Sequence, residues 1–205
     1  APGVAPLRDL RAEGADHGWI WELGGGGADA LLPPEFLLAI RLRVGADVFV
    51  APGLCSRCGV SRGLDGFHAV CCAPGEATRG HNKVADHLLE LASISDGGAR
   101  PEVPGLIDDA PALRPADILT DAAFGRLSAL DVSIVAPHRA GGGIGGGTDA
   151  VAAQVAAKLR YYGPFLPDLA TGGIAYSRLV WSAWGRPHPD ATAAINSMAA
   201  AASRR

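Results

Sequence analysis

Four residues in one short segment carry the side chains that bind zinc in proteins. Cys55 and Cys58 form a C-x-x-C pair, and His68 and Cys72 follow, with Cys71 as an alternative last ligand. A C-x-x-C turn supplies two thiolates from one tight loop, and zinc takes four such ligands in a tetrahedral arrangement. We therefore predict one structural zinc site at Cys55, Cys58, His68 and Cys72.

His81 is the second candidate for the histidine ligand of this cluster, in place of His68. All four cysteines of the chain lie between Cys55 and Cys72, whereas the disulfide frameworks of secreted domains spread their cysteines more widely. The clustering favours metal binding in a reducing, intracellular compartment. Thiolates bound to zinc are not free nucleophiles, so the cluster does not indicate a cysteine-dependent enzyme.

A second group of residues could hold a different kind of metal. Asp117 and Asp131 each lie on an expected extended segment, and Glu102 lies on the extended segment before them. Carboxylates that meet at neighbouring strand ends are ligands for magnesium or manganese. An ion held there can activate water and stabilise the charge that develops on a phosphodiester. Lys158, on the following helix, could point at the same place.

The elements that must position these residues follow from hydrophobic periodicity and from Gly and Pro signals. Helices are expected over 34–44, 82–95 and 148–162, and extended segments over 101–107, 113–120, 130–136, 165–170 and 174–180. Asn82 is expected to cap the second helix. The third helix is expected to bury Val151, Val155, Leu159 and Tyr162. The order predicts an α/β (α+β) fold with a mixed central sheet flanked by helices.

Composition limits the function further. The 205 residues carry a formal net charge of −3, and a domain that binds nucleic acid unaided usually carries a basic excess. We therefore expect weak DNA binding with little sequence preference, with Arg57, Arg62 and Arg79 as the contacts. No run of apolar residues is long enough to span a membrane, so we expect no membrane partner.

The glycine-rich run 141–147 invites a nucleotide-binding interpretation. A P-loop would need a lysine directly before Thr148, and Gly147 stands there. The loop that contains this run, from Pro137 to Gly147, is also too long for the tight turn of a dinucleotide-binding fold. A flexible linker is the preferred interpretation.

Together these residues resemble the restriction-like endonuclease domain of early-branching non-LTR retrotransposon polyproteins. That domain resembles a PD-(D/E)XK nuclease preceded by a CCHC zinc knuckle and a His-Asn pair, with its lysine displaced to the next helix. The matching residues are Cys55, Cys58, His68 and Cys72 of the knuckle, His81 and Asn82, Arg114 to Asp117, Asp131 to Ser133, and Lys158. The resemblance covers about residues 34–173, and it departs at Gly80, where a basic residue is expected, and at Ala116, which splits the proline–aspartate pair.

The resemblance implies a metal-dependent DNA endonuclease that nicks target DNA to prime reverse transcription. Glu102, Asp117 and Asp131 would bind magnesium or manganese, and Lys158 would contact the phosphate or position the water. The partners would be DNA and the reverse transcriptase part of a longer polyprotein, in the nucleus. The alternative is a catalytically inactive nuclease fold that binds nucleic acid or protein.

The expected domain organisation has four parts. They are an N-terminal leader and helix (1–45), a zinc knuckle (46–82), a restriction-endonuclease-like core (83–180) and an alanine-rich tail (181–205).

Overall fold

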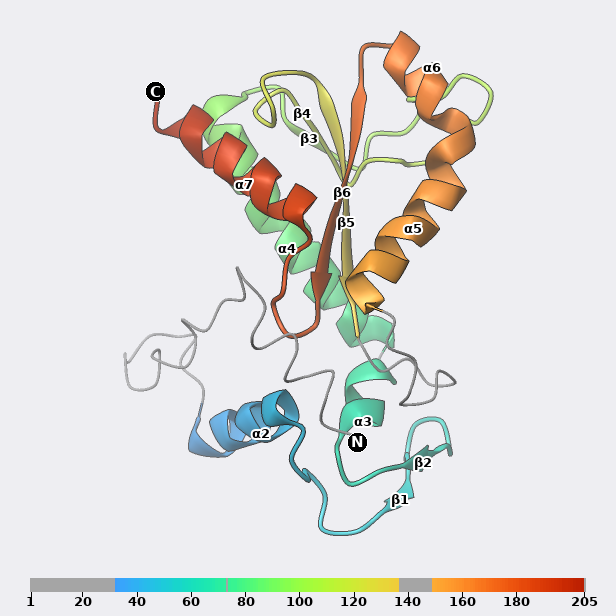
Figure 1. The fold of residues 1–205 in the computed structure, drawn as a ribbon, viewed down its shortest axis with the longest axis vertical. Helices are drawn as coiled ribbons and strands as arrows, with labels where there is room; N and C mark the ends of the chain where they lie inside the picture. The colour runs from blue at the N-terminus through green and yellow to red at the C-terminus, as the bar shows by residue number, and fades with distance from the viewer. Residues whose placement is uncertain (1–31, 73, 137–148, 205) are drawn as a thin grey trace. The chain divides into compact units, whose positions relative to one another are not determined.

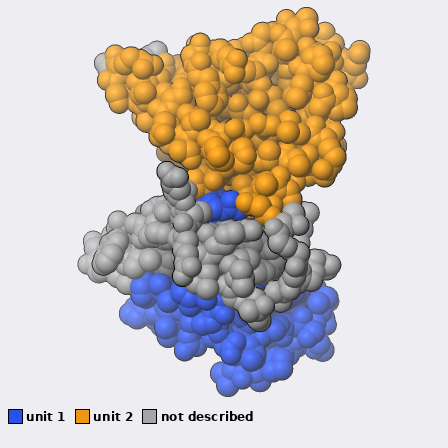
Figure 2. All heavy atoms as spheres, in the orientation of Figure 1, with its two compact units in different colours: residues 1–77, 136–147, 182–186 blue, residues 78–135, 148–181, 187–205 orange. Residues whose placement is uncertain are grey.

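The computed structural model describes residues 32–72, 74–136 and 149–204. The chain divides into two compact units, which Figure 2 distinguishes by colour. Of the described residues, the first unit contains 32–72, 74–77, 136 and 182–186. The second unit contains 78–135, 149–181 and 187–204. The expected leader and the glycine run 141–147 with Thr148 lie outside the described residues. Among the helices that the structure describes, none is both long and apolar enough to cross a membrane.

The first unit contains a helix, a small hairpin and a short second helix. Helix α2 (Pro33–Val44) begins at a proline, which suits the first turn because its missing N–H needs no partner there. It ends at Gly45, whose φ of 69° is left-handed, a conformation that glycine adopts without strain. Strands β1 (Gly53–Leu54) and β2 (Ser61–Arg62) pair antiparallel, and α3 (Phe67–Cys71) follows.

The second unit is built on a four-stranded sheet in the order β3-β4-β5-β6. The strands are β3 (Arg100–Pro101), β4 (Ile118–Thr120), β5 (Ser128–Val135) and β6 (Ala175–Ser182), of which Ser182 falls in the first unit. The β3–β4 and β4–β5 pairs are antiparallel. Strands β5 and β6 run in the same direction, with a helix returning between them (Figure 1). The expected mixed sheet flanked by helices is confirmed.

Helices cover both faces of this sheet. Helix α4 (Pro74–Ser95) and α7 (Pro189–Ala202) lie on one face, and α5 (Ala150–Tyr162) and α6 (Leu166–Thr171) lie on the other (Figure 1). The core under the first pair joins side chains from α4, the sheet and α7. Its fully buried members include Ala92, Leu130, Leu179, Ala194 and Met198.

Strand β5 presents different side chains to the two layers because successive residues of a strand point to opposite faces. Leu130 and Val132 belong to the core with α4 and α7. Asp131 and Ser133 instead contact side chains of α5. The alternation therefore delivers a carboxylate from the sheet to the α5 layer.

Several expected elements differ from those observed. The segment 165–170 is helical rather than a strand: Phe165 ends a short 3-10 helix (Gly163–Phe165), and the remaining residues belong to α6, where Pro167 suits the first turn. Helix α4 starts at Pro74, so Asn82 lies inside it and does not cap it. The expected tail contains α7, which packs into the core through Ala191 and Met198. On α5, Val151 is buried as expected, but Leu159 is 37% exposed.

Candidate metal centres

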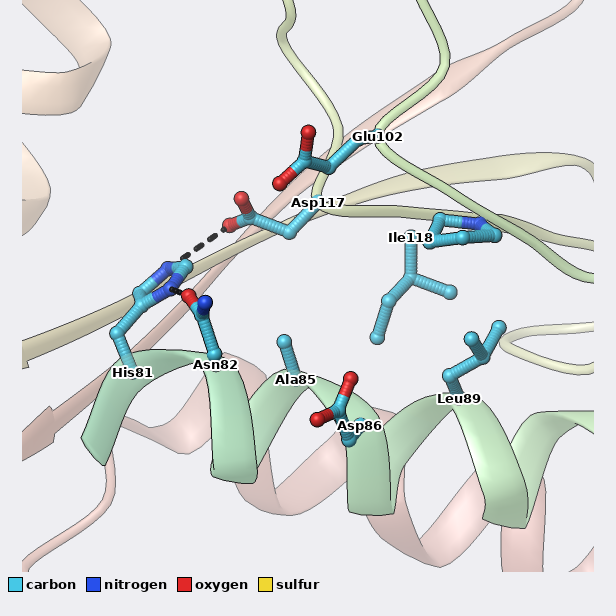
Figure 3. A pocket seen from close by; sticks show the side chains of 9 residues that line it. His81, Asn82, Ala85, Asp86, Leu89, Glu102, Asp117 and Ile118 are labelled. Carbon is cyan, nitrogen blue, oxygen red and sulfur yellow. Dashed lines mark hydrogen bonds and ion pairs between the residues drawn. The ribbon is translucent and has the colours of Figure 1, made fainter. Parts of the chain in front are cut away.

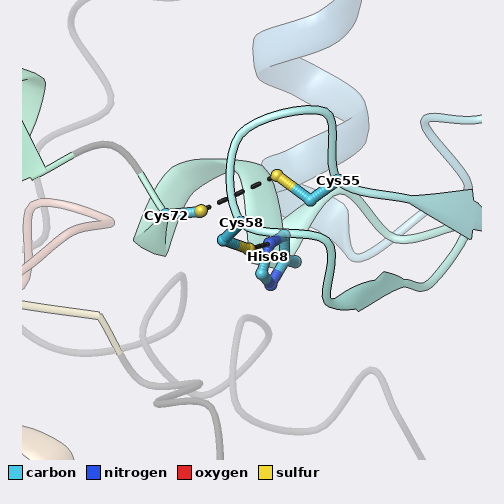
Figure 4. A group of neighbouring side chains, drawn as sticks. All are labelled: Cys55, Cys58, His68 and Cys72. Atoms are coloured by element: carbon cyan, nitrogen blue, oxygen red, sulfur yellow. Dashed lines mark hydrogen bonds between the residues drawn. The ribbon is translucent and has the colours of Figure 1, made fainter.

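The four residues of the predicted zinc knuckle lie together. One ligand atom from each of Cys55, Cys58, His68 and Cys72 falls within 4.8 Å of all the others. The sulfurs of Cys55 and Cys72 are 3.7 Å apart, and Sγ of Cys58 is 3.2 Å from Nε2 of His68 (Figure 4). Two thiolates on one tetrahedral zinc lie about 3.8 Å apart, given Zn–S bonds of about 2.3 Å. The cluster is therefore compatible with zinc.

The hairpin and α3 bring these four side chains together. Cys55 and Cys58 occupy the tight turn between β1 and β2, where the N–H of Gly59 donates to the carbonyl of Cys55 at 2.8 Å. Helix α3 carries His68, and Cys72 ends it by donating its N–H to the carbonyl of His68 at 2.8 Å. The two halves of the site thus come from two separate turns of the chain.

Gly66 lets α3 start close to the rest of the first unit. Its φ is 72°, and a Cβ at this position would stand 3.0 Å from the side chain of Leu42 and 3.1 Å from that of Val48. Only glycine adopts this conformation readily, and only glycine leaves room for these two side chains. The residue therefore sets where His68 lies.

The thiols of the cluster have unequal acidity. Hydrogen bonds from the backbone N–H groups of Cys58 and Arg57 lower the pKa of Cys55 to about 6. A side-chain hydrogen bond with Cys58, together with burial and the nearby thiolates, raises the pKa of Cys72 to about 12. A bound cation would relieve the repulsion that keeps the Cys72 proton in place, so metal binding and deprotonation of Cys72 are coupled.

The two alternative ligands have different outcomes. His81 contacts Asp117 in the second unit, so His68 is the histidine of the cluster. The side chain of Cys71 lies outside the described residues. The thiols of Cys55, Cys58 and Cys72 form no disulfide.

The predicted DNA-contacting arginines have different surroundings. Arg57 is exposed on the hairpin turn. The guanidinium of Arg62 lies over the ring of Phe49, with Cζ 4.0 Å from the ring centroid. Arg79 is exposed on α4, in the second unit.

The three predicted acids lie on neighbouring strands of the second unit, but they are not all at strand ends. Glu102 directly follows β3 and Asp117 directly precedes β4, whereas Asp131 lies in the middle of β5. The register pairs Pro101 with Ile118, and the N–H of the next residue, Glu102, donates to the carbonyl of Asp117 at 2.9 Å. Ile118 pairs with Leu130 on the antiparallel neighbour. Asp117 precedes Ile118 and Asp131 follows Leu130, so the two aspartates lie opposite each other on adjacent strands. The sheet thus aligns the three residues in a row across β3, β4 and β5.

Asp131 is the buried member of this row, with 5% of its surface exposed. Nζ of Lys158 donates to its Oδ1 at 2.5 Å and to the carbonyl of Val132 at 3.2 Å. The hydroxyl of Tyr176, from β6, donates to Oδ2 at 2.5 Å. Burial raises the pKa of the Asp131 carboxyl, and the ammonium and the hydroxyl oppose that rise. Lys158 therefore reaches Asp131 from α5.

Asp117 is held from the opposite layer. Its Oδ2 accepts a 2.6 Å hydrogen bond from the N–H of Val132 and lies 3.4 Å from Nε2 of His81 (Figure 3). Nδ1 of His81 is 3.2 Å from Oδ1 of Asn82. Both ring nitrogens thus face acceptors, and chiefly the hydrogen bond with Asp117 raises the pKa of His81 to about 9. His81 is a cation beside Asp117 at neutral pH.

A small open pocket of about 120 Å³ lies beside these groups. Figure 3 shows the carboxylates of Glu102 and Asp117 side by side and the imidazole of His81 rising towards them from α4. Ala85, Leu89 and Ile118 form the apolar part of its lining. Glu102 and Asp117 line the polar end of the pocket, whereas Asp131 is not part of its lining and contacts Lys158 of α5 instead.

Glu102 is the least constrained of the three acids. Its side chain is 65% exposed, and Oε2 accepts a 2.7 Å hydrogen bond from Arg114. Its φ of 43° is unusual for a residue with a side chain and indicates local backbone strain. Among the described residues, no three carboxylates have oxygens within 4.8 Å of one another, so the row is more open than a closed metal cage.

Two contacts of this site have no counterpart among the sequence motifs. Tyr176 lies on a strand distant in sequence and belongs to no motif. His81 was noted as a candidate zinc ligand and as half of a His-Asn pair, but its contact with Asp117 was not expected. The only sequence signal for this contact is that His81 is in register with the apolar stripe by which the expected helix faces the sheet.

The site combines oxygen ligands suited to magnesium with a fixed cation. Carboxylate oxygens are the type of ligand that hard divalent ions take. An ammonium beside them can stabilise negative charge on a substrate oxygen. No family model, curated protein or solved structure that was compared with the chain matches it.

Proposed function

We propose that the second unit is a metal-dependent phosphodiesterase that nicks DNA. The observation that carries the proposal is the contact between Lys158 and Asp131, in a row of acids that also includes Asp117. An acid pair with a lysine from the following helix is the arrangement that the resemblance to retrotransposon endonucleases implies. That resemblance is also the reason to take DNA as the substrate and a reverse transcriptase polyprotein in the nucleus as its setting.

The residues present fit a magnesium or manganese ion. A carboxylate has about four lone-pair sites on its two oxygens, so Asp131 retains acceptor capacity beyond its bonds to Lys158 and Tyr176. Asp117 likewise has Oδ1 in addition to the Oδ2 that accepts from Val132. The bound ion would activate water and offset the charge on the phosphodiester.

Each residue of the chain has a defined task in this proposal. Asp117 and Asp131 bind the ion, and Glu102 contributes as an outer ligand. Lys158 uses two of its three N–H donors on Asp131 and Val132. The third donates to a phosphate oxygen, where it stabilises charge that grows in the transition state. His81 holds Asp117 from the α4 side.

We also propose one structural zinc in the Cys55, Cys58, His68 and Cys72 cluster. The distances between these ligand atoms support the assignment. The first unit has little secondary structure around the cluster, with two-residue strands and a five-residue helix. In such a unit the free energy of metal binding is also free energy of folding.

A nicking assay on supercoiled plasmid tests the enzyme proposal. The full chain should convert supercoiled to open-circular DNA with magnesium or manganese and not with EDTA. Asp117→Asn, which keeps the size of the side chain, is the matched negative control. Nicking by Asp117→Asn at the parent rate would identify a contaminant and overturn the proposal. DNA binding by the parent without nicking would favour the inactive binding module, which the occupied oxygens of Asp131 also allow.

A further inference from the structure

Tyr176 is the residue of the site that no motif assigns. Its hydroxyl donates to Oδ2 of Asp131 at 2.5 Å, while Lys158 occupies Oδ1 at the same distance. Tyr176 lies on β6 and Asp131 on β5, which are neighbours in the sheet. The strand on the other side of β5 is β4, next to which Asp117 lies. Tyr176 and Asp117 therefore approach Asp131 from opposite sides.

The hydroxyl of Tyr176 is a permanent donor. Burial and the neighbouring carboxylate of Asp131 raise the pKa of Tyr176 above its ordinary value. The phenol has a single O–H, and its hydroxyl lies at hydrogen-bonding distance from Oδ2 of Asp131. An ionised carboxylate only accepts hydrogen bonds, so the direction of this bond is fixed.

The ring of Tyr176 is held in place by a second tyrosine. Its centroid is 5.3 Å from that of Tyr162. The hydroxyl of Tyr162 donates to the carbonyl of Arg114 at 3.2 Å, so Tyr162 is itself anchored. Tyr161 makes an edge contact with Tyr162 at 4.8 Å and is 60% exposed. The three tyrosines of the chain thus form one row that ends at Asp131.

We propose that Tyr176 is a positioning residue that fixes the carboxylate of Asp131 for binding a divalent cation. By holding Oδ2 from the β6 side, the hydroxyl prevents rotation of the carboxylate and keeps its remaining lone pairs directed for the ion that Asp117 shares. Lys158 alone cannot do this, because it holds one oxygen only. The inference rests on the proposed nuclease function and adds a residue that the resemblance does not supply.

Tyr176→Phe is the sharpest variant because it removes one oxygen and keeps the ring against Tyr162. The readout is calorimetric titration of Mn²⁺ into the zinc-loaded full chain, with nicking measured against Mg²⁺ concentration. Loss of a hydrogen bond to a charged group should weaken metal binding on the order of 10-fold. The nicking rate at saturating metal should change less than the metal concentration that half-saturates it. A side chain that only fills space would leave that concentration unchanged.

Tyr161→Phe is the matched control, since it makes the same chemical change on an exposed ring of the same row. Its metal dependence should equal that of the parent. Equal metal affinity in the parent and Tyr176→Phe would overturn the role of Tyr176 and leave the nuclease proposal standing. A parent chain that binds no more Mn²⁺ than Asp117→Asn would overturn both.

A second measurement needs no substitution at position 176. With three tyrosines in the chain, 3-fluorotyrosine labelling gives three ¹⁹F resonances, and Tyr161→Phe identifies the exposed one. Mg²⁺ should shift the resonance of Tyr176, one of the two half-buried tyrosines, and leave that of Tyr161 in place, with the same concentration dependence as nicking. If none of the three ¹⁹F resonances shifted on addition of Mg²⁺, in a chain that nicks DNA, the result would contradict the proposal.

Discussion

The ammonium of Lys158 lies 2.5 Å from Oδ1 of Asp131, with 14% of the lysine side chain and 8% of the aspartate side chain exposed. The two residues come from α5 and β5, so the contact joins a helix to the sheet it covers. Removing one partner of a buried ion pair leaves an uncompensated charge away from water, which costs more than the pair contributes. Lys158 therefore affects stability as well as the proposed chemistry.

Lys158→Met should reduce both the stability of the fold and the rate of nicking. The methionine keeps much of the stem but leaves Asp131 with only the hydroxyl of Tyr176. We expect the free energy of unfolding to fall by about 3 kcal/mol, measured by urea denaturation. Nicking of plasmid DNA should fall by about 100-fold or more at a temperature where the variant is folded.

The double variant that combines Lys158→Met with Asp131→Asn separates the effect on stability from the effect on nicking. Neutralising the aspartate removes the buried charge, so the double variant should regain part of the stability that Lys158→Met loses. It should not regain nicking, because Asp131 is a proposed metal ligand. Additive losses of stability would contradict a direct ion pair.

The pair formed by His81 and Asp117 predicts a pH dependence of stability. The pKa of His81 is raised from 6.5 to about 9, mainly by its hydrogen bond with Asp117. A group whose pKa is higher in the folded state stabilises the fold below the unfolded pKa, and this contribution is lost as pH rises through the folded pKa. The free energy of unfolding, measured without added magnesium, should therefore lose this contribution between about pH 6.5 and 9.

His81→Gln should flatten this part of the pH profile relative to the parent. His87 offers a matched control on the same helix, where its side chain is 78% exposed beside Glu90. His87→Gln should keep the pH dependence of the parent. An unchanged profile in His81→Gln would show that the contact with Asp117 does not contribute to stability.

The sequence predicted much of this site because its residues lie on elements with strong periodic signals. Strand β5 places the apolar residues Leu130 and Val132 on either side of Asp131, and α5 follows it with Lys158 on a defined helical turn. Neighbouring strands place such residues at one level of a sheet. The cysteine spacing was similarly informative, since a C-x-x-C turn supplies two of the four ligands of a tetrahedral zinc site.

The remaining features depend on tertiary packing that no local pattern specifies. Tyr176 reaches Asp131 only because β6 lies beside β5 in the sheet, although the two residues are 45 positions apart in the sequence. Phe165–Ala170 has the apolar run of a strand, but its proline begins a helix. In α7 small alanines face the core together with Met198. Because alanine is only weakly hydrophobic, the composition of this segment does not indicate that one face of the helix is buried.

Zinc content tests the first unit. Protein purified without added metal should contain about one zinc per chain, measured by elemental analysis. Cys72→Ser should lose the metal, because Cys72 closes the cluster from α3. Cys71→Ser is the matched control at the neighbouring residue and should retain it. Loss of zinc from Cys71→Ser and its retention in Cys72→Ser would reassign the fourth ligand.

Removal of zinc should affect the two units differently. A chelator should increase amide hydrogen exchange over residues 53–72, since two-residue strands and a short helix have few other stabilising contacts. Exchange in β5 should change little, because its core belongs to the second unit. Equal loss of protection in both regions would show that the second unit does not fold independently of the metal.

The three acids should contribute unequally to nicking, in the order of their burial. Asp117→Asn should reduce nicking to the level of the EDTA control, since Asp117 is held between Val132 and His81 and its charge is needed for the ion. Glu102 is 65% exposed and paired with Arg114, and exposed pairs are worth at most about 1 kcal/mol. Glu102→Gln should therefore reduce the nicking rate by about 5-fold or less.

Arg114→Ala provides the control, because it frees the Glu102 carboxylate from its ion pair without altering the aspartates. If Glu102 were a direct ligand restrained by Arg114, this variant would bind Mn²⁺ more tightly than the parent, and Glu102→Gln would match the loss in Asp117→Asn. We expect neither result, because the backbone of Glu102 joins the row of acids whereas its carboxylate lies at the edge of it.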